Sequence, residues 1–157
     1  LETFNEIPSD NISFDLRPWM KCAEITDVLI EKIKSGNYDA LRVNFPNGDM
    51  VGHTGSFIAA KISVEALDVC LARILKAVDE VKGIAIITAD HGNADKMVDE
   101  DGKPFTAHTT NPVPFCVIGY DCKLREGGKL CDISPTIIKL LGVPQPAEMT
   151  GESIIID

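Results

Sequence analysis

Three histidines and two aspartates have the spacing expected of side chains that bind metal ions. The histidines are His53, His91 and His108, and each lies among small or polar residues. Asp49 precedes His53 by four residues, and Asp90 is adjacent to His91. Imidazole together with carboxylate is a ligand set for Zn, Mn, Fe or Co rather than for Ca. The sequence therefore predicts a transition-metal site.

The number of candidate ligands favours a two-metal centre. Five ligands are too many for one four-coordinate site with an open position, and too few for two complete sites. Two ions about 3.5–4 Å apart, lacking one or two ligands, fit this number best. Taken singly, each residue has a simpler explanation, since a loop histidine is usually solvated, Asp90 would cap a turn and Asp49 would belong to an Asn-Gly-Asp turn. The three histidine contexts together favour metal binding.

A serine hydrolase is the other chemistry that histidine and aspartate serve. The sequence contains no G-x-S-x-G element, which holds the nucleophile in one large class of these enzymes. Ser56 and Ser63 fall at the start of, or inside, a predicted long helix, where a capping or solvated role is expected. We therefore assign no catalytic residue in this chain.

The first two histidine motifs follow predicted strands. Alternating apolar and polar residues predict a strand over residues 39–45. An amphipathic pattern predicts a helix over 57–81, and the apolar run 84–89 is typical of a central parallel strand covered on both faces. These elements would form a right-handed βαβ unit. Because ligands bind beyond the carboxyl ends of parallel strands, both motifs are expected at one edge of the sheet.

The rest of the pattern completes an α/β class with a mainly parallel sheet. Residues 1–21 are punctuated by turn-forming residues and are predicted to be an irregular segment connecting to one domain, 22–157. Gly36 and Gly142 stand where helix C-terminal caps belong. Within the domain the sequence predicts helices over 22–34 and 133–141, strands over 115–119 and 154–156, and a long loop over 90–112.

Composition argues against several kinds of partner. The 157 residues carry a formal charge of −9, from 15 Lys and Arg against 24 Asp and Glu. Nucleic acid or an anionic membrane would require a basic patch, and no apolar run approaches the roughly 20 residues of a membrane span. The five cysteines are widely spaced and lack a C-x-x-C pair. We therefore expect free thiols, packed as small apolar residues, in a reducing cytoplasm.

Three stretches resemble the metal motifs of one enzyme family in residue type, order and approximate spacing. They are residues 47–55 (NGDMVGHTG), 88–95 (TADHGNAD) and 106–114 (TAHTTNPVP). The family is that of the cofactor-independent (2,3-bisphosphoglycerate-independent) phosphoglycerate mutases, in the alkaline phosphatase superfamily. The resemblance runs from about residue 14 to the C-terminus. It implies a three-layer α/β/α fold, incomplete here, and the C-terminal part of the metal-binding phosphatase-like domain.

The resemblance also implies a role for each candidate ligand. Asp49, His53 and His108 would bind one metal ion, usually Mn²⁺. Asp90 and His91 would bind a second, and Mg²⁺, Co²⁺ and Zn²⁺ are not separated by ligand type at this level. The family completes the second site with an Asp and the nucleophilic Ser of an N-terminal segment, and it binds phosphoglycerate largely through an inserted domain.

The activity that the resemblance implies belongs to a longer protein. The whole enzyme would interconvert 3-phosphoglycerate and 2-phosphoglycerate through a phosphoserine intermediate, in glycolysis and gluconeogenesis. The chain begins with Leu1 rather than Met. We therefore expect a C-terminal fragment that is inactive alone, because the nucleophilic Ser lies outside it, and we expect the protein to be a cytoplasmic monomer.

One stretch departs from the family pattern. Many members carry Ser-Pro-Lys ahead of an aromatic-Asp pair, with the lysine in the active site. Here Ser9, Asp10 and Asn11 precede Phe14 and Asp15, and no lysine matches. We therefore assign no substrate-binding residue. Two alternatives stay open: another phosphomutase or phosphohydrolase of the superfamily, such as a phosphopentomutase, and a non-catalytic metal-binding module.

Overall fold

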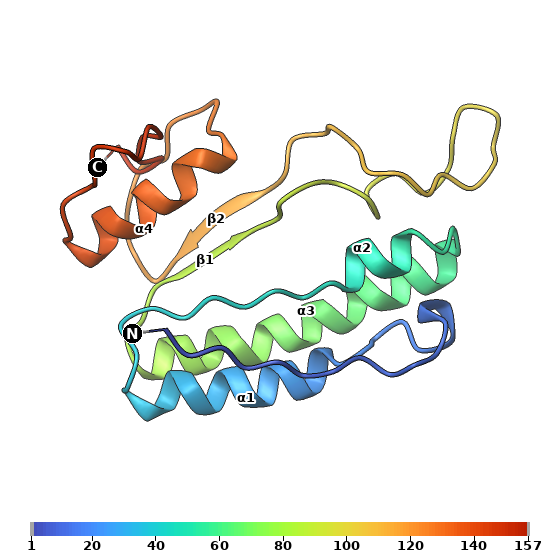
Figure 1. The fold of residues 1–157 in the computed structure, drawn as a ribbon, viewed down its shortest axis with the longest axis horizontal. Coiled ribbons are helices and arrows are strands. Elements are labelled where there is room, and N and C mark those ends of the chain that lie inside the picture. The colour runs from blue at the N-terminus through green and yellow to red at the C-terminus, as the bar shows by residue number, and fades with distance from the viewer. Residues whose placement is uncertain (1, 157) are drawn as a thin grey trace.

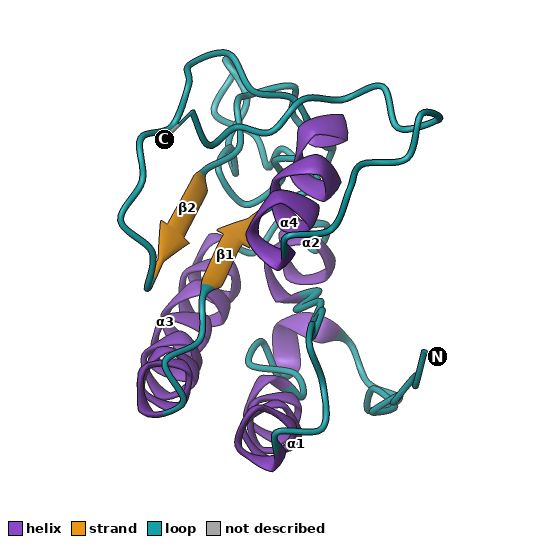
Figure 2. Cartoon of the chain, turned by 90° about the vertical axis from the view of Figure 1, so that its left-hand side faces the viewer, coloured by secondary structure: helices purple, strands orange, loops and turns teal. Residues whose placement is uncertain are grey.

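Helices lie on both sides of a short pair of strands in the computed structural model, which describes residues 2–156 (Figure 1, Figure 2). The elements in chain order are the 3-10 helix η1 (Phe14–Leu16), α1 (Cys22–Ser35), α2 (Asn47–Gly52), α3 (Phe57–Glu80), β1 (Ala85–Thr88), β2 (Phe115–Ile118), the 3-10 helix η2 (Leu130–Asp132) and α4 (Ile133–Leu141). Figure 1 shows α4 on one side of the strands, with α1 and α3 on the other. This arrangement agrees with the expected α/β class.

The helices α1, α3 and α4 form where the sequence predicts them. Gly36 caps the C-terminus of α1 and Gly142 that of α4, both in the left-handed conformation, with φ of 67° and 66°. The Ser56 hydroxyl accepts a hydrogen bond from the Ala59 backbone N–H at 3.3 Å and caps α3, as predicted. Within residues 2–156, no helix is both long and apolar enough to cross a membrane.

The two strands pair antiparallel, with Ala85 opposite Ile118, so the mainly parallel sheet that the sequence predicts is not formed among residues 2–156. They fall within the predicted strands at 84–89 and 115–119. The prediction of a strand over 39–45 was wrong. These residues run as a loop from α1 to α2 and pair with no strand in the described part of the chain (Figure 1). The βαβ unit is therefore not formed among residues 2–156. Alternation identifies an extended backbone, whereas a strand also requires a neighbour for its hydrogen bonds.

The strand pair is less buried than the apolar run of its sequence predicts. Residues Ala85 to Ile87 of β1 are only half-buried and Thr88 is exposed, so the expected cover on both faces is missing within residues 2–156. The edge strand predicted at 154–156 is reduced to one antiparallel bridge between Leu124 and Ile155. The apolar residues of these segments are therefore paired less extensively than their sequence would allow.

The best-buried apolar cluster lies where the N-terminal segment meets α2 and α3. It consists of Met20, Val51 and Ala59, and the partly buried Phe14 and Met50 pack against it. Residues of the predicted connecting segment 1–21 thus take part in the core. The boundary predicted at residue 22 stays a prediction.

The cysteines follow the sequence prediction only in part. All five are free thiols, and Cys22 and Cys70 are buried on α1 and α3. Burial, together with a hydrogen bond to Cys70, raises the pKa of the Cys22 thiol to about 11, which makes it an unreactive thiol. The prediction of buried packing was wrong for Cys116 and Cys131, which are exposed, because the outer surfaces of β2 and η2 are uncovered in this chain.

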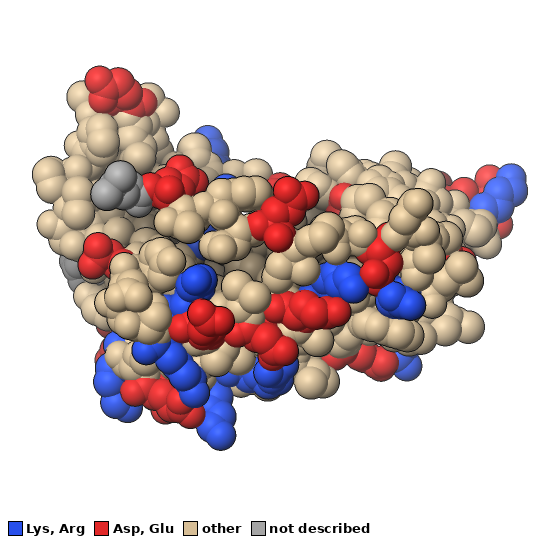
Figure 3. Space-filling model, turned by 60° about the horizontal axis from the view of Figure 1, so that its bottom comes forward, with Lys and Arg blue, Asp and Glu red and all other residues tan. Residues whose placement is uncertain are grey.

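The face formed by α1 and α3 mixes acidic and basic side chains (Figure 3). Two ion pairs join the helices: Lys34 Nζ lies 2.7 Å from Glu80 Oε2, and Arg73 Nη2 lies 2.5 Å from Asp27 Oδ1. All four side chains are substantially exposed, so each pair contributes little stability. Such a mixture is typical of a solvated helix face.

Replacing Thr136 with valine should lower the free energy of unfolding by about 1–3 kcal/mol, since it leaves two buried backbone groups without a partner. The fully buried Thr136 hydroxyl donates to the Asp132 carbonyl at 2.7 Å and accepts from the Ile154 N–H at 2.9 Å. Urea unfolding measures the change. The matched control is Thr110→Val at an exposed position, and equal unfolding free energies for the two variants would contradict the assigned role.

Candidate metal centre

Asp49 lies in α2, a short helix that the sequence did not predict. Its glycines favoured a turn, but residues 47–52 are helical, and this was a missed element. The helix is fixed by a distant contact: the buried Asn47 amide donates to the carbonyl oxygens of Pro18 at 3.2 Å and Trp19 at 2.9 Å. Residues four apart share one helix face, so α2 directs Asp49 and His53, its C-terminal cap, to the same side.

Three side-chain atoms meet at this face of α2. Asp49 Oδ1 lies 3.1 Å from His53 Nε2 and 3.0 Å from His108 Nε2, and the two Nε2 atoms lie 3.1 Å apart. Around an octahedral ion with bonds of about 2.1 Å, neighbouring ligand atoms stand about 3.0 Å apart. The spacing of these three atoms therefore fits a small divalent cation.

Hydrogen bonding sets the His53 imidazole in the form that binds metal. Its Nδ1 lies 2.7 Å from the backbone carbonyl of Thr106, which can only accept, so Nδ1 carries a proton. In the neutral ring Nε2 is then the free lone pair, and it faces Asp49 and His108. A backbone carbonyl on the second nitrogen is the usual way in which proteins orient a metal-binding histidine.

The Asp49 carboxylate is ionised as a ligand requires. Burial alone would raise its pKa, but the hydrogen bond from Asn93 and the nearby His53 and His108 outweigh burial and hold the pKa of Asp49 below its usual range. The carboxylate is therefore charged at neutral pH. It supplies a negative charge to a bound cation, which the two neutral imidazoles do not.

His91 joins this group, whereas Asp90 lies at its margin. The His91 ring stacks on His108 with centroids 3.8 Å apart, and one ligand atom from each of Asp49, His91 and His108 falls within 4.8 Å of the others. The Asp90 side chain is 80% exposed, and its Oδ1 lies 3.8 Å from His91 Nε2. The structure thus gathers four of the five predicted ligands closely and leaves Asp90 facing solvent beside His91.

Polar residues that the sequence did not single out hold the two loops together. The Thr109 N–H donates to the Gly92 carbonyl at 2.8 Å, which joins the His108 loop to the His91 loop. Asp95 accepts from the Thr109 hydroxyl at 2.9 Å and from the Asn111 amide at 2.6 Å, and the Asn111 bond is the chief cause of its lowered pKa. These residues lie within the stretches 88–95 and 106–114 that resemble the family motifs, but the sequence alone gave none of them a role.

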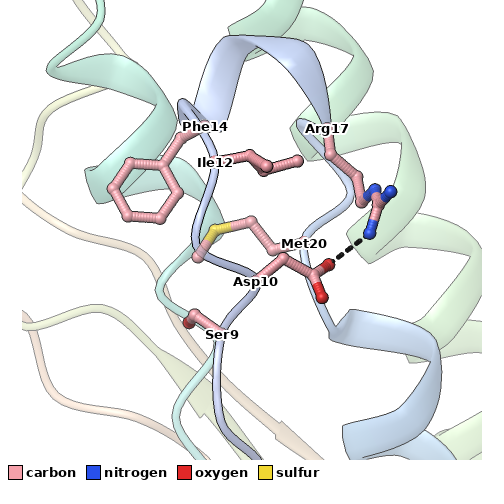
Figure 4. Close-up of a pocket in the computed structure, with 6 residues that line it drawn as sticks. All are labelled: Ser9, Asp10, Ile12, Phe14, Arg17 and Met20. Atoms are coloured by element: carbon pink, nitrogen blue, oxygen red, sulfur yellow. Dashed lines mark hydrogen bonds and ion pairs between the residues drawn. The ribbon is translucent and has the colours of Figure 1, made fainter.

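The segment that departs from the resembled family encloses little space. Its cavity, lined by Ser9, Ile12 and Met20 among others, has a volume of about 10 Å³ (Figure 4), room for about one water molecule. Asp10 pairs with Arg17 at 2.5 Å and Lys21 at 2.9 Å. The hydrogen bond from Lys21 is the chief cause that lowers the pKa of Asp10, and the hydrogen bond from Arg17 is the next. This cavity is too small for a phosphorylated substrate.

The family model described as the metalloenzyme superfamily matches residues 2–145. The chain belongs to the metalloenzyme superfamily. Membership and the cluster of Asp49, His91 and His108 together indicate a divalent-metal protein.

Proteins similar to this chain include 2,3-bisphosphoglycerate-independent phosphoglycerate mutases. The chain is 53% identical over 153 residues to the 2,3-bisphosphoglycerate-independent phosphoglycerate mutase of Pseudomonas fluorescens (strain Pf0-1), covering 96% of this chain and 30% of the relative. It is 52% identical over 152 residues to that of Clostridium botulinum (strain Langeland), covering 95% and 30%. The chain thus spans about 30% of the length of these relatives, and the resemblance found in its motifs is confirmed.

A solved structure gives the same result for the fold. The chain matches the crystal structure of Leishmania mexicana phosphoglycerate mutase at low cobalt concentration with a TM-score of 0.89 and 43% identity. The match covers 98% of this chain and 31% of the other. The α/β, alkaline phosphatase-like fold is therefore confirmed, and this chain corresponds to 31% of that structure.

Proposed function

We propose that this chain supplies the metal-binding part of the active site of a cofactor-independent phosphoglycerate mutase, which interconverts 3-phosphoglycerate and 2-phosphoglycerate. The observation that carries the proposal is the meeting of Asp49 Oδ1 with the Nε2 atoms of His53 and His108 at 3.0–3.1 Å. This geometry occurs in a chain 53% identical to such a mutase. The motifs therefore serve a site in the folded chain.

The residues divide between two ions in this proposal. Asp49, His53 and His108 hold one divalent ion, with Mn²⁺ the preferred metal, and His91 with Asp90 provides part of a second site. The exposed Asp90 carboxylate accepts from the His91 backbone N–H at 3.1 Å, which keeps it beside the His91 ring. When bound, the two ions lower the pKa of a serine hydroxyl and neutralise the phosphoryl oxygens. The role of the Thr106 carbonyl is to keep the His53 ring oriented.

The remaining parts of the reaction are proposed for residues outside this sequence. These parts are the nucleophilic Ser, its phosphoserine intermediate and the groups that bind phosphoglycerate. We accordingly propose that the 157-residue chain binds metal but has no mutase turnover by itself. A cytoplasmic monomer as the form of the whole enzyme belongs to the same proposal.

A chimera tests the function. This chain would replace the matching 30% of the Pseudomonas fluorescens mutase, and the hybrid is expected to convert 3-phosphoglycerate to 2-phosphoglycerate in a coupled enolase assay. Activity should disappear on chelation and return with Mn²⁺. The isolated chain, assayed in parallel, should show none.

The chimera also has outcomes that contradict the proposal. A hybrid that folds with the thermal stability of the parent enzyme and binds Mn²⁺, yet lacks mutase activity, would exclude this substrate. Hydrolysis of a generic phosphate ester by that hybrid would instead favour a phosphohydrolase of the superfamily. Turnover by the isolated chain would refute the assignment of the nucleophile to another segment.

A further inference from the structure

Asn93 contacts the same oxygen of the Asp49 carboxylate that faces the two histidines. Its side chain is 4% exposed. The amide Nδ2 donates to Asp49 Oδ1 at 2.8 Å and lies 3.2 Å from the Asp49 backbone oxygen. Asp49 Oδ1 is the same atom that faces His53 and His108. One amide group thus holds both the main chain and the carboxylate of this residue.

The other end of the Asn93 side chain has no partner. Its Oδ1 is buried and accepts no hydrogen bond within residues 2–156. An unpaired buried oxygen costs about 1–3 kcal/mol, so packing alone would favour an apolar residue of the same shape. The site nevertheless has an amide here, and the hydrogen bonds that this side chain makes all go to Asp49.

Gly52 provides the space for this arrangement. A Cβ atom at Gly52 would lie 2.2 Å from Asn93 Oδ1, so any larger residue would displace the amide. Gly52 is the last residue of α2 and adopts a helical conformation. The glycine at this position is therefore explained by the close approach of Asn93.

We propose that Asn93 is a positioning residue for the metal centre, which fixes Asp49 Oδ1 toward the two imidazoles before an ion arrives. The proposal rests on the proposed function only in taking Asp49 as a metal ligand. A carboxylate free to rotate would have to be ordered during binding, and that ordering weakens affinity. Residues that hydrogen-bond a metal ligand typically change affinity 10–100-fold when replaced.

Asn93→Leu tests the proposal, because leucine branches at Cγ as asparagine does and removes both amide atoms. Titration of Mn²⁺ into the metal-free 157-residue chain is expected to give a Kd about 10–100-fold weaker than that of the unmodified chain. The urea unfolding of the metal-free variant should change little, since the Asp49 carbonyl still accepts from the His53 N–H at 3.0 Å and the Asp49 carboxylate is partly exposed to water. Gly52→Ala should weaken Mn²⁺ binding in the same direction by displacing Asn93.

Thr136→Val is the control. Thr136 is also fully buried, but its hydroxyl binds Asp132 and Ile154 and not Asp49. This variant should lose stability and keep the Kd for Mn²⁺. An unchanged Kd in Asn93→Leu, or an equal weakening in Thr136→Val, would overturn the positioning role. Failure of the unmodified chain to bind Mn²⁺ would instead reject the proposed function, and the positioning role with it.

Discussion

Replacing Asp49 with alanine is expected to weaken divalent-metal binding by more than about 100-fold. This exceeds the effect that is typical for a residue that only hydrogen-bonds a metal ligand. Asp49 supplies the one anionic atom at the centre, and that atom lies 3.0–3.1 Å from both His53 and His108. Without it the remaining imidazoles are neutral ligands that gain nothing from charge pairing. Titration of Mn²⁺ into the metal-free chain, with metal content after dialysis as a second readout, measures the effect.

The control for this prediction is Asp68→Ala. Asp68 is exposed on α3, and its replacement changes the net charge equally. It should leave Mn²⁺ binding unchanged. His108→Ala should also lose metal while keeping the helical circular dichroism spectrum. Full metal content in either Asp49→Ala or His108→Ala would show that the ions bind elsewhere.

Replacing Asp132 with alanine should lower the free energy of unfolding by about 1–3 kcal/mol, the cost of leaving the hydrogen-bond donors around a buried carboxylate without a partner. The Asp132 side chain is 6% exposed and lies 2.6 Å from Arg125 Nη2. It also accepts from the backbone N–H groups of Lys129 at 2.8 Å and Glu152 at 2.9 Å. These contacts join the chain after β2 to the C-terminal segment, so their loss should open both.

Urea unfolding at neutral pH compares Asp132→Ala with Asp121→Ala. Asp121 is exposed, and its replacement should change the free energy of unfolding very little. Asp132→Asn, which keeps the shape, should fall between them. A loss from Asp132→Ala no greater than that from Asp121→Ala would show that the network does not support the fold.

The same carboxylate should make stability depend on pH. The N–H groups of Glu152 and Lys129, followed by Arg125, hold the pKa of Asp132 well below its usual range. A carboxyl whose pKa is lowered by folding stabilises the protein above its unfolded pKa of about 3.9, and this stability is lost as the pH falls further. Unfolding free energies measured from pH 6 down to pH 2 should therefore fall more steeply for the unmodified chain than for Asp132→Asn. Parallel curves would contradict the assignment.

The sequence predicted the elements whose signals are local. The apolar stripes of α1 and α3, and the glycines that cap α1 and α4, depend on residues a few positions apart. The extended character of 39–45 was also local, but its pairing was not, because the neighbour that would make it a strand is not among the described residues. The helix α2 was missed because a distant contact from Asn47 stabilises it against the turn preference of its glycines.

By itself the sequence determined which side chains are able to bind a metal: a carboxylate four residues before one histidine, a second Asp-His pair, and His108 in a polar loop. Only the tertiary structure decided that His53 and His108, 55 residues apart, place their Nε2 atoms 3.1 Å from each other, and that Asp90 faces solvent. It also decided that Asn93, 44 residues from Asp49, orients the carboxylate. Residue type fixes the chemistry of a ligand, whereas its direction is set by hydrogen bonds to groups that local sequence patterns do not specify.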